Sequence, residues 1–379
     1  MRLAIVSSRF PKGRGEPYLG VELEALRPHL SYLTVEPVRP PLSLRTVALA
    51  AATCVSAPVR CIRALFEVLR GSGSPTVRLK NLTAFPRALA LAWEFRRQGI
   101  EHVHAYWLSV PATAALVISR VNGIPFSSTA HRWDITERNM IAEKARRASF
   151  VRVVSEYGRA ELARAVPHCA EKFSVVRLGT ALDEAGQGAR SERNDTLTLL
   201  CAAAFVPVKG HRDLLSAFER AHRVNPELEL TLCGTGTLED EIREYAENLT
   251  CSSAIHFAGY VERRTLLEQL RRGTYDAVIL ASRDDGREHE GVPSILIEAA
   301  SLGVACIATR SGSITELLGD DSAFLAPPHQ PHLLAQAILA ARNPIERRRR
   351  AARARERAVQ LHDPAHSAAQ LISLLGILA

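Results

Sequence analysis

The chain is 379 residues long, which suits two domains of ordinary size better than one compact core. With 47% hydrophobic and 23% charged residues, its composition is that of a globular protein and excludes disordered, collagen-like and coiled-coil chains. The net charge of +8 is uneven, because residues 1–180 hold 26 Lys and Arg against 13 Asp and Glu, whereas the remainder hold 22 against 27. A basic first half could face nucleic acid, an anionic membrane or a phosphorylated substrate, and charge alone does not choose among them.

The first half of the chain alternates between strand-like and helical segments. Strands are predicted at 2–8, 32–38, 102–107, 125–131, 150–156 and 173–179, with helices between them at 21–30, 110–121, 138–147 and 157–166. Residues 40–98 differ: they have helical periodicity, many arginines and few strand signals. The start, MRLAIVSS, reads as the first strand and not as a signal peptide.

The second half alternates more regularly after a polar linker at 183–195. Strands are predicted at 196–205, 228–234, 255–259, 276–282 and 304–310, and helices at 211–222, 237–247, 263–272, 293–302 and 313–318. Strands separated by ~10–15-residue helices indicate parallel sheets covered on both faces. The fold class is therefore α/β, with two doubly wound Rossmann-like domains at 1–182 and 183–358. Ligands of such sheets bind at the carboxyl ends of the strands, so we expect the site in a central cleft between the domains.

Cysteine usage and hydropathy bear on the compartment. The seven cysteines are scattered and show no C-x-x-C spacing, which argues against a disulfide framework or a cysteine-rich zinc site and fits a reducing compartment. The most apolar stretch, 47–59, is shorter than the ~20 apolar residues that a membrane span needs. We expect a soluble, cytoplasmic protein.

The most informative segment runs from Glu290 to Leu318. Pro293 suits the first turn of a helix, and the free amides around Gly291–Ile295 then form an anion site that the helix dipole strengthens. Glu290 stands just before this helix and Glu298 lies a little over one turn inside it. Two acids that flank a phosphate-binding helix end can accept hydrogen bonds from hydroxyl groups on either side of the phosphate, an arrangement that a nucleotide sugar offers.

This segment resembles the signature of the retaining GT-B glycosyltransferases of family 4 (group 1), in which Glu, seven residues and a second Glu are combined with Gly and Pro after the first acid. The resemblance spans almost the whole chain and implies the GT-B fold. It implies that Glu290 contacts the donor sugar hydroxyls and that Glu298 holds the ribose. The donor site would also contain Gly291, Val292, Pro293 and Ser294.

Further positions resemble the same family in the expected order. Lys209 looks like the lysine that contacts the donor diphosphate, although Ala204 stands where an arginine is usual; Arg212 or a first-domain arginine would then supply the second cation. Gly234 resembles the family's Gly-x-Gly turn, and Val261 a segment whose backbone contacts the base. Gly15 lies in a loop similar to the glycine loop that approaches the diphosphate.

His131 follows the strand at 125–131 in a segment, Thr129 to Asp134, that looks like the family's Thr-x-His-x-x-Asp. The resemblance places His131 close to the donor sugar and acceptor, so the predicted catalytic residues are Glu290, His131 and Lys209. Residues 359–379 resemble the terminal helix that crosses back to the first domain.

The helical region at 40–98 is similar to inserts in exopolysaccharide-assembly and colanic-acid-type members, whose first domain meets a lipid-linked acceptor. Basic residues there favour an anionic leaflet by about 1 kcal/mol each near the surface. We therefore expect peripheral contact with the inner face of the membrane. The alternative is an acceptor-domain surface that is merely rich in arginine.

The family implies a retaining hexosyltransferase that uses a UDP or GDP sugar and a saccharide acceptor in polysaccharide or glycoconjugate biosynthesis. The nucleotide sugar is a co-substrate, and no cofactor is expected. The sequence contains no D-x-D, and Asp284–Asp285 and Asp320–Asp321 are adjacent pairs that suit a metal poorly, so we expect metal-independent activity. The alternatives are a nucleotide-sugar epimerase of the same fold and a non-catalytic donor-binding member. The run at 347–357 reads as a solvated helix face, and we expect no nucleic-acid partner.

Overall fold

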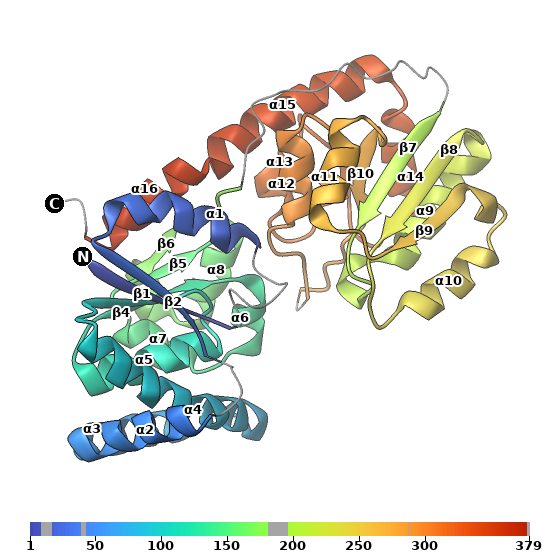
Figure 1. The fold of residues 1–379 in the computed structure, drawn as a ribbon. Coiled ribbons are helices and arrows are strands. Elements are labelled where there is room, and N and C mark those ends of the chain that lie inside the picture. Colours follow the sequence, from blue (N-terminus) through green and yellow to red (C-terminus); the bar gives the residue numbers. More distant parts are fainter. Residues whose placement is uncertain (9–16, 39–42, 181–195, 287, 377–379) are drawn as a thin grey trace. The chain divides into compact units, whose positions relative to one another are not determined.

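The computed structural model describes residues 1–8, 17–38, 43–180, 196–286 and 288–376. The chain divides into two compact units (Figure 1). Unit 1 comprises Met1–Gly179 together with Pro364–Ala379, and unit 2 comprises Thr180–Asp363. Each unit has its own six-stranded sheet, in which neighbouring strands are parallel.

The sheet of unit 1 has the strand order β2-β1-β3-β4-β5-β6. Its strands are β1 (Arg2–Ser7), β2 (Tyr32–Pro37), β3 (His102–Ala105), β4 (Phe126–Ala130), β5 (Val151–Val153) and β6 (Phe173–Val175). The central strands are buried along their length, as a parallel sheet covered on both faces requires. The covering helices are α1 (Pro17–Leu26), α5 (Val110–Asn122), α6 (Arg132–Glu137), α7 (Ile141–Arg147), α8 (Glu156–Ala165) and α16 (Pro364–Leu374).

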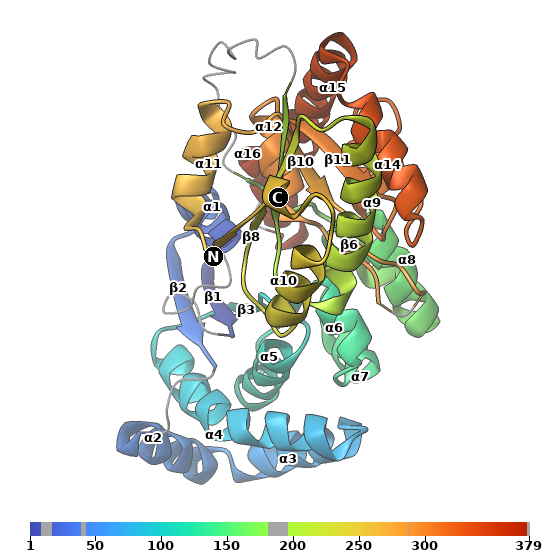
Figure 2. The same cartoon turned by 90° about the vertical axis from the view of Figure 1, so that its right-hand side faces the viewer.

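The region predicted to be helical at 40–98 forms three helices that interrupt this alternation: α2 (Leu44–Ser56), α3 (Pro58–Gly71) and α4 (Pro75–Arg97). Helix α4 packs on α5, whereas α2 packs on α4 and α3 packs on α5 and α4. Both views place α2 and α3 at the outer edge of unit 1 (Figures 1 and 2). In the described part of the chain no single helix is long and apolar enough to cross a membrane; α2 and α3 meet that test only as a pair, and they are bent by 111°.

The sheet of unit 2 has the order β12-β11-β10-β7-β8-β9. Its strands are β7 (Leu197–Ala202), β8 (Leu228–Cys233), β9 (Ile255–Gly259), β10 (Ala277–Leu280), β11 (Ala305–Thr309) and β12 (Phe324–Ala326). The helices are α9 (His211–Val224), α10 (Glu239–Glu247), α11 (Arg263–Arg271), α12 (Ser294–Ser301), α13 (Ile314–Leu318), α14 (Pro331–Ala340) and α15 (Pro344–His362). The prediction of two parallel α/β sheets is confirmed. Strand β12 was not predicted, because a three-residue strand is too short to show a pattern.

The C-terminal segment changes unit at Asp363, a few residues after the predicted position of 359. Helix α15 belongs to unit 2, and α16 packs on α1 in unit 1, where Leu371 and Ile372 join the apolar cluster of Leu19 and Leu23. The arginines of 347–357 serve unit 2 itself: Arg347 pairs with Asp276. Other arginines of this run also contact unit 2: Arg350 pairs with Glu346, Arg353 pairs with Asp321, and Arg357 donates to the Glu316 carbonyl.

Candidate active site

Glu290 is a buried acid of unit 2, and Lys209 is its partner. The loops that carry these two residues follow β10 and β7, which are neighbours in the sheet, so residues 81 positions apart meet. Lys209 Nζ lies 2.6 Å from Glu290 Oε2, and Ser282 Oγ donates to the same oxygen at 2.7 Å. The backbone amide of Gly291 donates to Oε1 at 3.1 Å. The carboxylate thus accepts three hydrogen bonds although the residue is only 7% exposed.

The ionisation of Glu290 follows from these contacts. Burial by itself raises the pKa of this carboxyl, but the Lys209 ammonium and the hydrogen bonds from Ser282 and Gly291 outweigh it and hold the pKa below its usual 4.5. Glu290 is therefore ionised at neutral pH and forms a buried ion pair with Lys209.

The loop that follows β11 holds the backbone of Glu290 in place. Ser311 Oγ accepts a hydrogen bond from the Glu290 amide at 2.8 Å and donates to the Arg283 carbonyl at 2.6 Å. Gly312 follows with a φ of +50°, and a Cβ atom there would overlap the Glu290 carbonyl oxygen. Only glycine fits this position, because both the left-handed backbone and the close approach exclude a side chain.

Helix α12 begins one residue later than predicted. Pro293 is its N-cap and Ser294 its first helical residue; Pro293 is buried, Ser294 is exposed, and Gly291 and Val292 are half-buried. At the other end Gly303 has a φ of +67°, and the amides of Gly303 and Val304 bond back to Ala300 and Ala299, which is a Schellman motif. Every residue of the helix after Ser294 is buried, so its N-terminal amides are held in a rigid setting.

Glu298 lies on α12 and pairs with a residue that the sequence analysis did not single out. Arg263 Nε, at the start of α11, donates to Glu298 Oε1 at 2.7 Å. Burial nevertheless dominates and raises the pKa of Glu298 above 4.5, against the effect of Arg263. The two acids of the predicted signature thus have opposite shifts: Glu290 is stabilised as the carboxylate and Glu298 is not.

The remaining donor-site candidates of unit 2 lie at strand ends and helix starts. Gly234 directly follows β8 and has a φ of +146°; its amide donates to the Gly259 carbonyl at 2.8 Å, and a Cβ there would overlap the Ala203 carbonyl. Val261 follows β9 and packs against the core. Arg212 pairs with Glu241 of α10 at 2.8 Å and lies over the Tyr245 ring of the same helix.

In unit 1, His131 lies at the carboxyl end of β4, as predicted, and is the N-cap of α6. Its amide donates to Asp134 Oδ2 at 2.9 Å, and Asp134 Oδ1 accepts from the Ser109 amide at 2.8 Å. The imidazole ring packs against Trp107, with ring centroids 4.2 Å apart, and against Tyr106 at 5.8 Å. The ring is 8% exposed, so Asp134 and the two aromatic residues fix its position.

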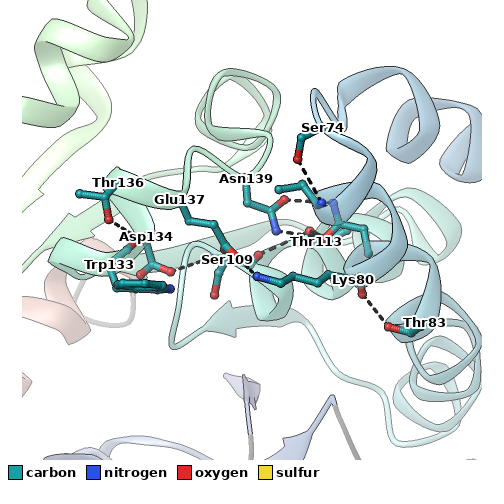
Figure 3. A network of polar contacts seen from close by, with 12 residues as sticks. Ser74, Lys80, Thr83, Ser109, Thr113, Trp133, Asp134, Thr136, Glu137 and Asn139 are labelled. Carbon is teal, nitrogen blue, oxygen red and sulfur yellow. Dashed lines mark hydrogen bonds and ion pairs between the residues drawn. The ribbon is translucent and has the colours of Figure 1, made fainter. Parts of the chain in front are cut away.

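A buried polar network, drawn in Figure 3, ties the His131 segment to helix α4. Lys80 of α4 pairs with Glu137 at the end of α6 at 2.7 Å, and Asn81 Nδ2 donates to Asn139 Oδ1 at 3.0 Å. The loop between α6 and α7 has two non-glycine residues in the left-handed region, Arg138 and Met140, each with a φ of 52°. Such strain persists only where the surroundings fix the backbone, and this network is what fixes it.

Lys144 of α7 also holds that loop in place, and its role was not predicted from the sequence. Its side chain is fully buried, and Nζ donates to the carbonyls of Leu108, Ser109 and Asn139 at 2.7–2.9 Å. Burial lowers the pKa of Lys144 to about 7, although Asp134, Glu137 and Glu143 favour its charged form. A lysine inside a helical Ala-Glu-Lys-Ala-Arg-Arg segment gives no sign of burial, so no sequence signal identified it.

A second buried charge lies beside Tyr106. Arg152 of β5 pairs with Glu22 of α1, and the Tyr106 hydroxyl also donates to Glu22. Arg152 further donates to the Val176 and Arg177 carbonyls, each at 2.8 Å. An arginine within the strand Val-Arg-Val-Val was the available signal, because a charge in a buried strand requires a partner.

One predicted site residue, Gly15, lies outside the described residues. The described residues contain no group of three or more His, Cys, Asp or Glu side chains that could hold a metal ion.

Comparison with known families identifies unit 2. Residues 186–357 match the model of the family described as glycosyl transferases group 1. Unit 2 is therefore a group 1 glycosyl transferase domain.

Two curated relatives and one solved structure indicate how far the similarity reaches. Glycogen synthase of Mycobacterium tuberculosis is 28% identical over 188 residues, which cover 49% of this chain and 44% of that protein. A GDP-mannose-dependent alpha-(1-6)-phosphatidylinositol monomannoside mannosyltransferase of Mycolicibacterium smegmatis is 24% identical over 265 residues, or 66% of this chain and 69% of that one. The crystal structure of Anabaena Alr3699/HepE in complex with UDP aligns over 100% of both chains, with a TM-score of 0.73 and 16% identity. The chain spans less than half of the first of these relatives, and the structural likeness shows that the fold is GT-B.

Proposed function

We propose that this chain, whose residues 186–357 match the model of the group 1 glycosyl transferases, is a retaining hexosyltransferase that takes its sugar from a UDP or GDP donor. The observation that carries the proposal is the buried Lys209–Glu290 pair directly before the N-terminus of α12, with Glu298 inside that helix. Two relatives support the donor class: HepE was crystallised with UDP, and the mycolicibacterial enzyme is named as GDP-mannose-dependent.

The donor diphosphate would lie between Lys209 and the first amides of α12. These amides have no partner inside the helix, and the helix dipole favours negative charge there. As the diphosphate approaches, Lys209 exchanges part of its contact with Glu290 for a contact with phosphate. Lys209 then stabilises the charge that develops on the leaving group, and Glu290 accepts hydrogen bonds from hydroxyl groups of the donor sugar.

Glu298 would bind the ribose hydroxyls from inside α12. Its raised pKa reflects a carboxyl that burial has separated from water, and a hydroxyl pair would replace the missing water contacts. Arg263 keeps the carboxyl in place when no donor is bound. In this arrangement Glu290 binds the sugar end of the donor and Glu298 the nucleoside end.

The reaction would be a displacement on one face of the sugar. The bond between the anomeric carbon and the departing phosphate oxygen breaks, and the acceptor hydroxyl oxygen bonds to that carbon on the same side. The acceptor proton passes to the departing phosphate oxygen, so no protein base is required. His131, fixed by Asp134 and Trp107, would bind the sugar or the acceptor.

The acceptor would be a saccharide, and we favour one linked to a lipid, in polysaccharide or glycoconjugate biosynthesis. The basic first half supports this choice, since its charge balance of 26 against 13 suits phosphorylated lipids at a membrane surface. We place the protein in the cytoplasm, peripheral on the inner face of the membrane. No cofactor would take part, and nucleotide release would not need a metal.

The test is a panel of UDP- and GDP-linked hexoses, incubated with the purified chain while nucleotide release is followed, with and without excess chelator. We expect slow hydrolysis of one donor, unchanged by chelator, and lost in Glu290→Ala. Glu288→Ala, two residues away and exposed, is the matched control and should keep the activity. Activity that disappears in chelator and returns with Mg²⁺ would overturn metal independence, and an epimer formed from donor alone would overturn the transferase assignment.

A further inference from the structure

Helix α2 has its apolar side on the outside. The side chains that it buries are Thr46, Ala50 and Thr53, and Thr53 donates to the Leu89 carbonyl of α4 at 2.9 Å. The opposite side is exposed and apolar: Leu44 is 91% exposed, Val47 55% and Val55 84%, and Ala48 and Ala51 lie between them. A surface helix in water shows the reverse pattern, so the surroundings of α2 are not water alone.

Helix α3, which begins two residues after α2 ends, also exposes apolar side chains. It buries Cys61, Ala64 and Val68 and exposes Val59, Ile62, Phe66 and Leu69. Among the described residues thirteen large hydrophobic side chains are exposed, and eight of them lie between Leu44 and Leu79. Exposed apolar side chains concentrated in this way mark a binding surface. We call the exposed side chains of Leu44, Val47, Val55, Val59, Ile62, Phe66 and Leu69 the α2–α3 face.

Positive charge borders the α2–α3 face. Residues 43–98 hold nine Lys and Arg and two Asp and Glu. Both acids are already paired: Glu67 binds Arg120 and Arg147, and Glu94 binds Arg45 and Arg87. Arg63 and Arg70 have no acidic partner among the described residues. Together with Ile62 and Phe66 they line a hollow of about 610 Å³, where five arginines (63, 70, 120, 146 and 147) outnumber two acids, Glu67 and Glu143.

We propose that the α2–α3 face binds an anionic lipid bilayer, with its apolar side chains in the acyl boundary and Arg63 and Arg70 at the lipid phosphates. With 13 and 14 residues, α2 and α3 are too short to span a membrane but suit helices that lie in its plane. A second copy of this face is a poor partner, because it would bring unpaired arginines together. The inference names the surface for the membrane contact proposed above, and its test needs neither donor nor acceptor.

The first test is co-sedimentation of the full chain with vesicles of phosphatidylglycerol and phosphatidylcholine, compared with phosphatidylcholine alone. We expect binding to the anionic vesicles only. Arg63→Glu with Arg70→Glu should lower the partition coefficient more than ~25-fold, since each lost basic residue accounts for about fivefold. Ile62→Ser with Phe66→Ser should lower it more than about tenfold.

Matched controls come from α9. Val224 is 66% exposed, close to the 67% of Ile62, and Arg220 on the same helix is also exposed. Val224→Ser and Arg220→Glu should leave vesicle binding unchanged. Circular dichroism of each variant before sedimentation distinguishes loss of the surface from loss of the fold. Equal binding of the α3 variants and the wild type would overturn the proposal, as would equal binding to neutral vesicles or no binding to anionic ones.

A second test locates the face in the bilayer. Tryptophan introduced as Phe66→Trp should be quenched by brominated lipids in the anionic vesicles, whereas Val224→Trp should not be quenched beyond the wild-type background. Quenching at position 224 alone, or at neither position, would contradict the proposal. Dimers that the Ile62→Ser/Phe66→Ser variant converts to monomers would instead assign the face to a second copy of the chain. A silent donor panel with intact vesicle binding would refute the proposed activity and leave this inference standing.

Discussion

The Lys209–Glu290 pair allows a quantitative prediction. Removing one partner of a buried ion pair costs about 3–5 kcal/mol, because the other charge stays buried. Lys209 keeps 20% of its side chain exposed and Ser282 still bonds Glu290, so we expect Lys209→Met to cost less, about 2–3 kcal/mol. For a domain of this size that corresponds to a fall of about 4–12 °C in Tm.

The same substitution should reverse the pH dependence of stability. In the wild type the pKa of Glu290 lies below 4.5, so its stabilising effect is present above pH 4.5 and is lost as pH falls through the folded-state pKa. Without Lys209, burial dominates and raises the pKa above 4.5. The Lys209→Met protein should therefore gain stability as the pH falls from 7 toward 4.5, whereas the wild type should not.

Thermal unfolding followed by circular dichroism at pH 5 and pH 7 provides the assay. Glu290→Gln and the double variant complete a thermodynamic cycle, and we expect a coupling energy of at least about 1.5 kcal/mol between the two positions. The double variant should be more stable than Lys209→Met, because it contains no unpaired carboxylate. A coupling below about 0.5 kcal/mol, or parallel pH profiles for wild type and Lys209→Met, would refute the reasoning.

Three further predictions follow from single positions. Gly312→Ala should lower Tm and nucleotide release together, because its Cβ displaces the Glu290 carbonyl; an unchanged Tm would contradict this. The buried lysine Lys144, with a pKa of about 7, should make the wild type more stable as pH rises from 7 to 9, since the unfolded chain keeps a proton that the folded chain has lost; Lys144→Met should flatten that slope in thermal melts. Ala204 is exposed, so Ala204→Arg should be tolerated, and we expect it to tighten UDP binding severalfold by calorimetry, with no change counting against a diphosphate near this loop.

Local patterns predicted the elements with strong periodicity. Alternating strand-like and helical segments predicted eleven of the strands, and β10 is the clearest, because a strand buried along its whole length is apolar throughout. Gly303, directly after the helix predicted at 293–302, supplies the left-handed residue that the Schellman motif at the end of α12 needs. The three-residue strand β12 gave no such pattern. Helix α12 begins at Ser294, one residue after the predicted start at Pro293.

The polar partners could not be read from the sequence. Arg263 for Glu298, Glu22 for Arg152 and the carbonyls around Lys144 come from segments far apart in the chain. The chain offers many other acids, arginines and carbonyl groups with similar sequence neighbours, so nothing in the local sequence distinguishes the partner that is used. Burial selects the pair, because only a charge removed from water requires one specific partner.

The sequence alone determined the α/β class, the position of Glu290 and Glu298 around one helix start, and the strand end that carries His131. These features depend on spacing within a single strand or helix. Tertiary structure decided that β7 lies next to β10, which brings Lys209 to Glu290. It also decided which side of α2 faces outward: an amphipathic pattern identifies two sides, but only packing against α4 buries Thr46 and Thr53 and leaves Leu44 and Val55 exposed.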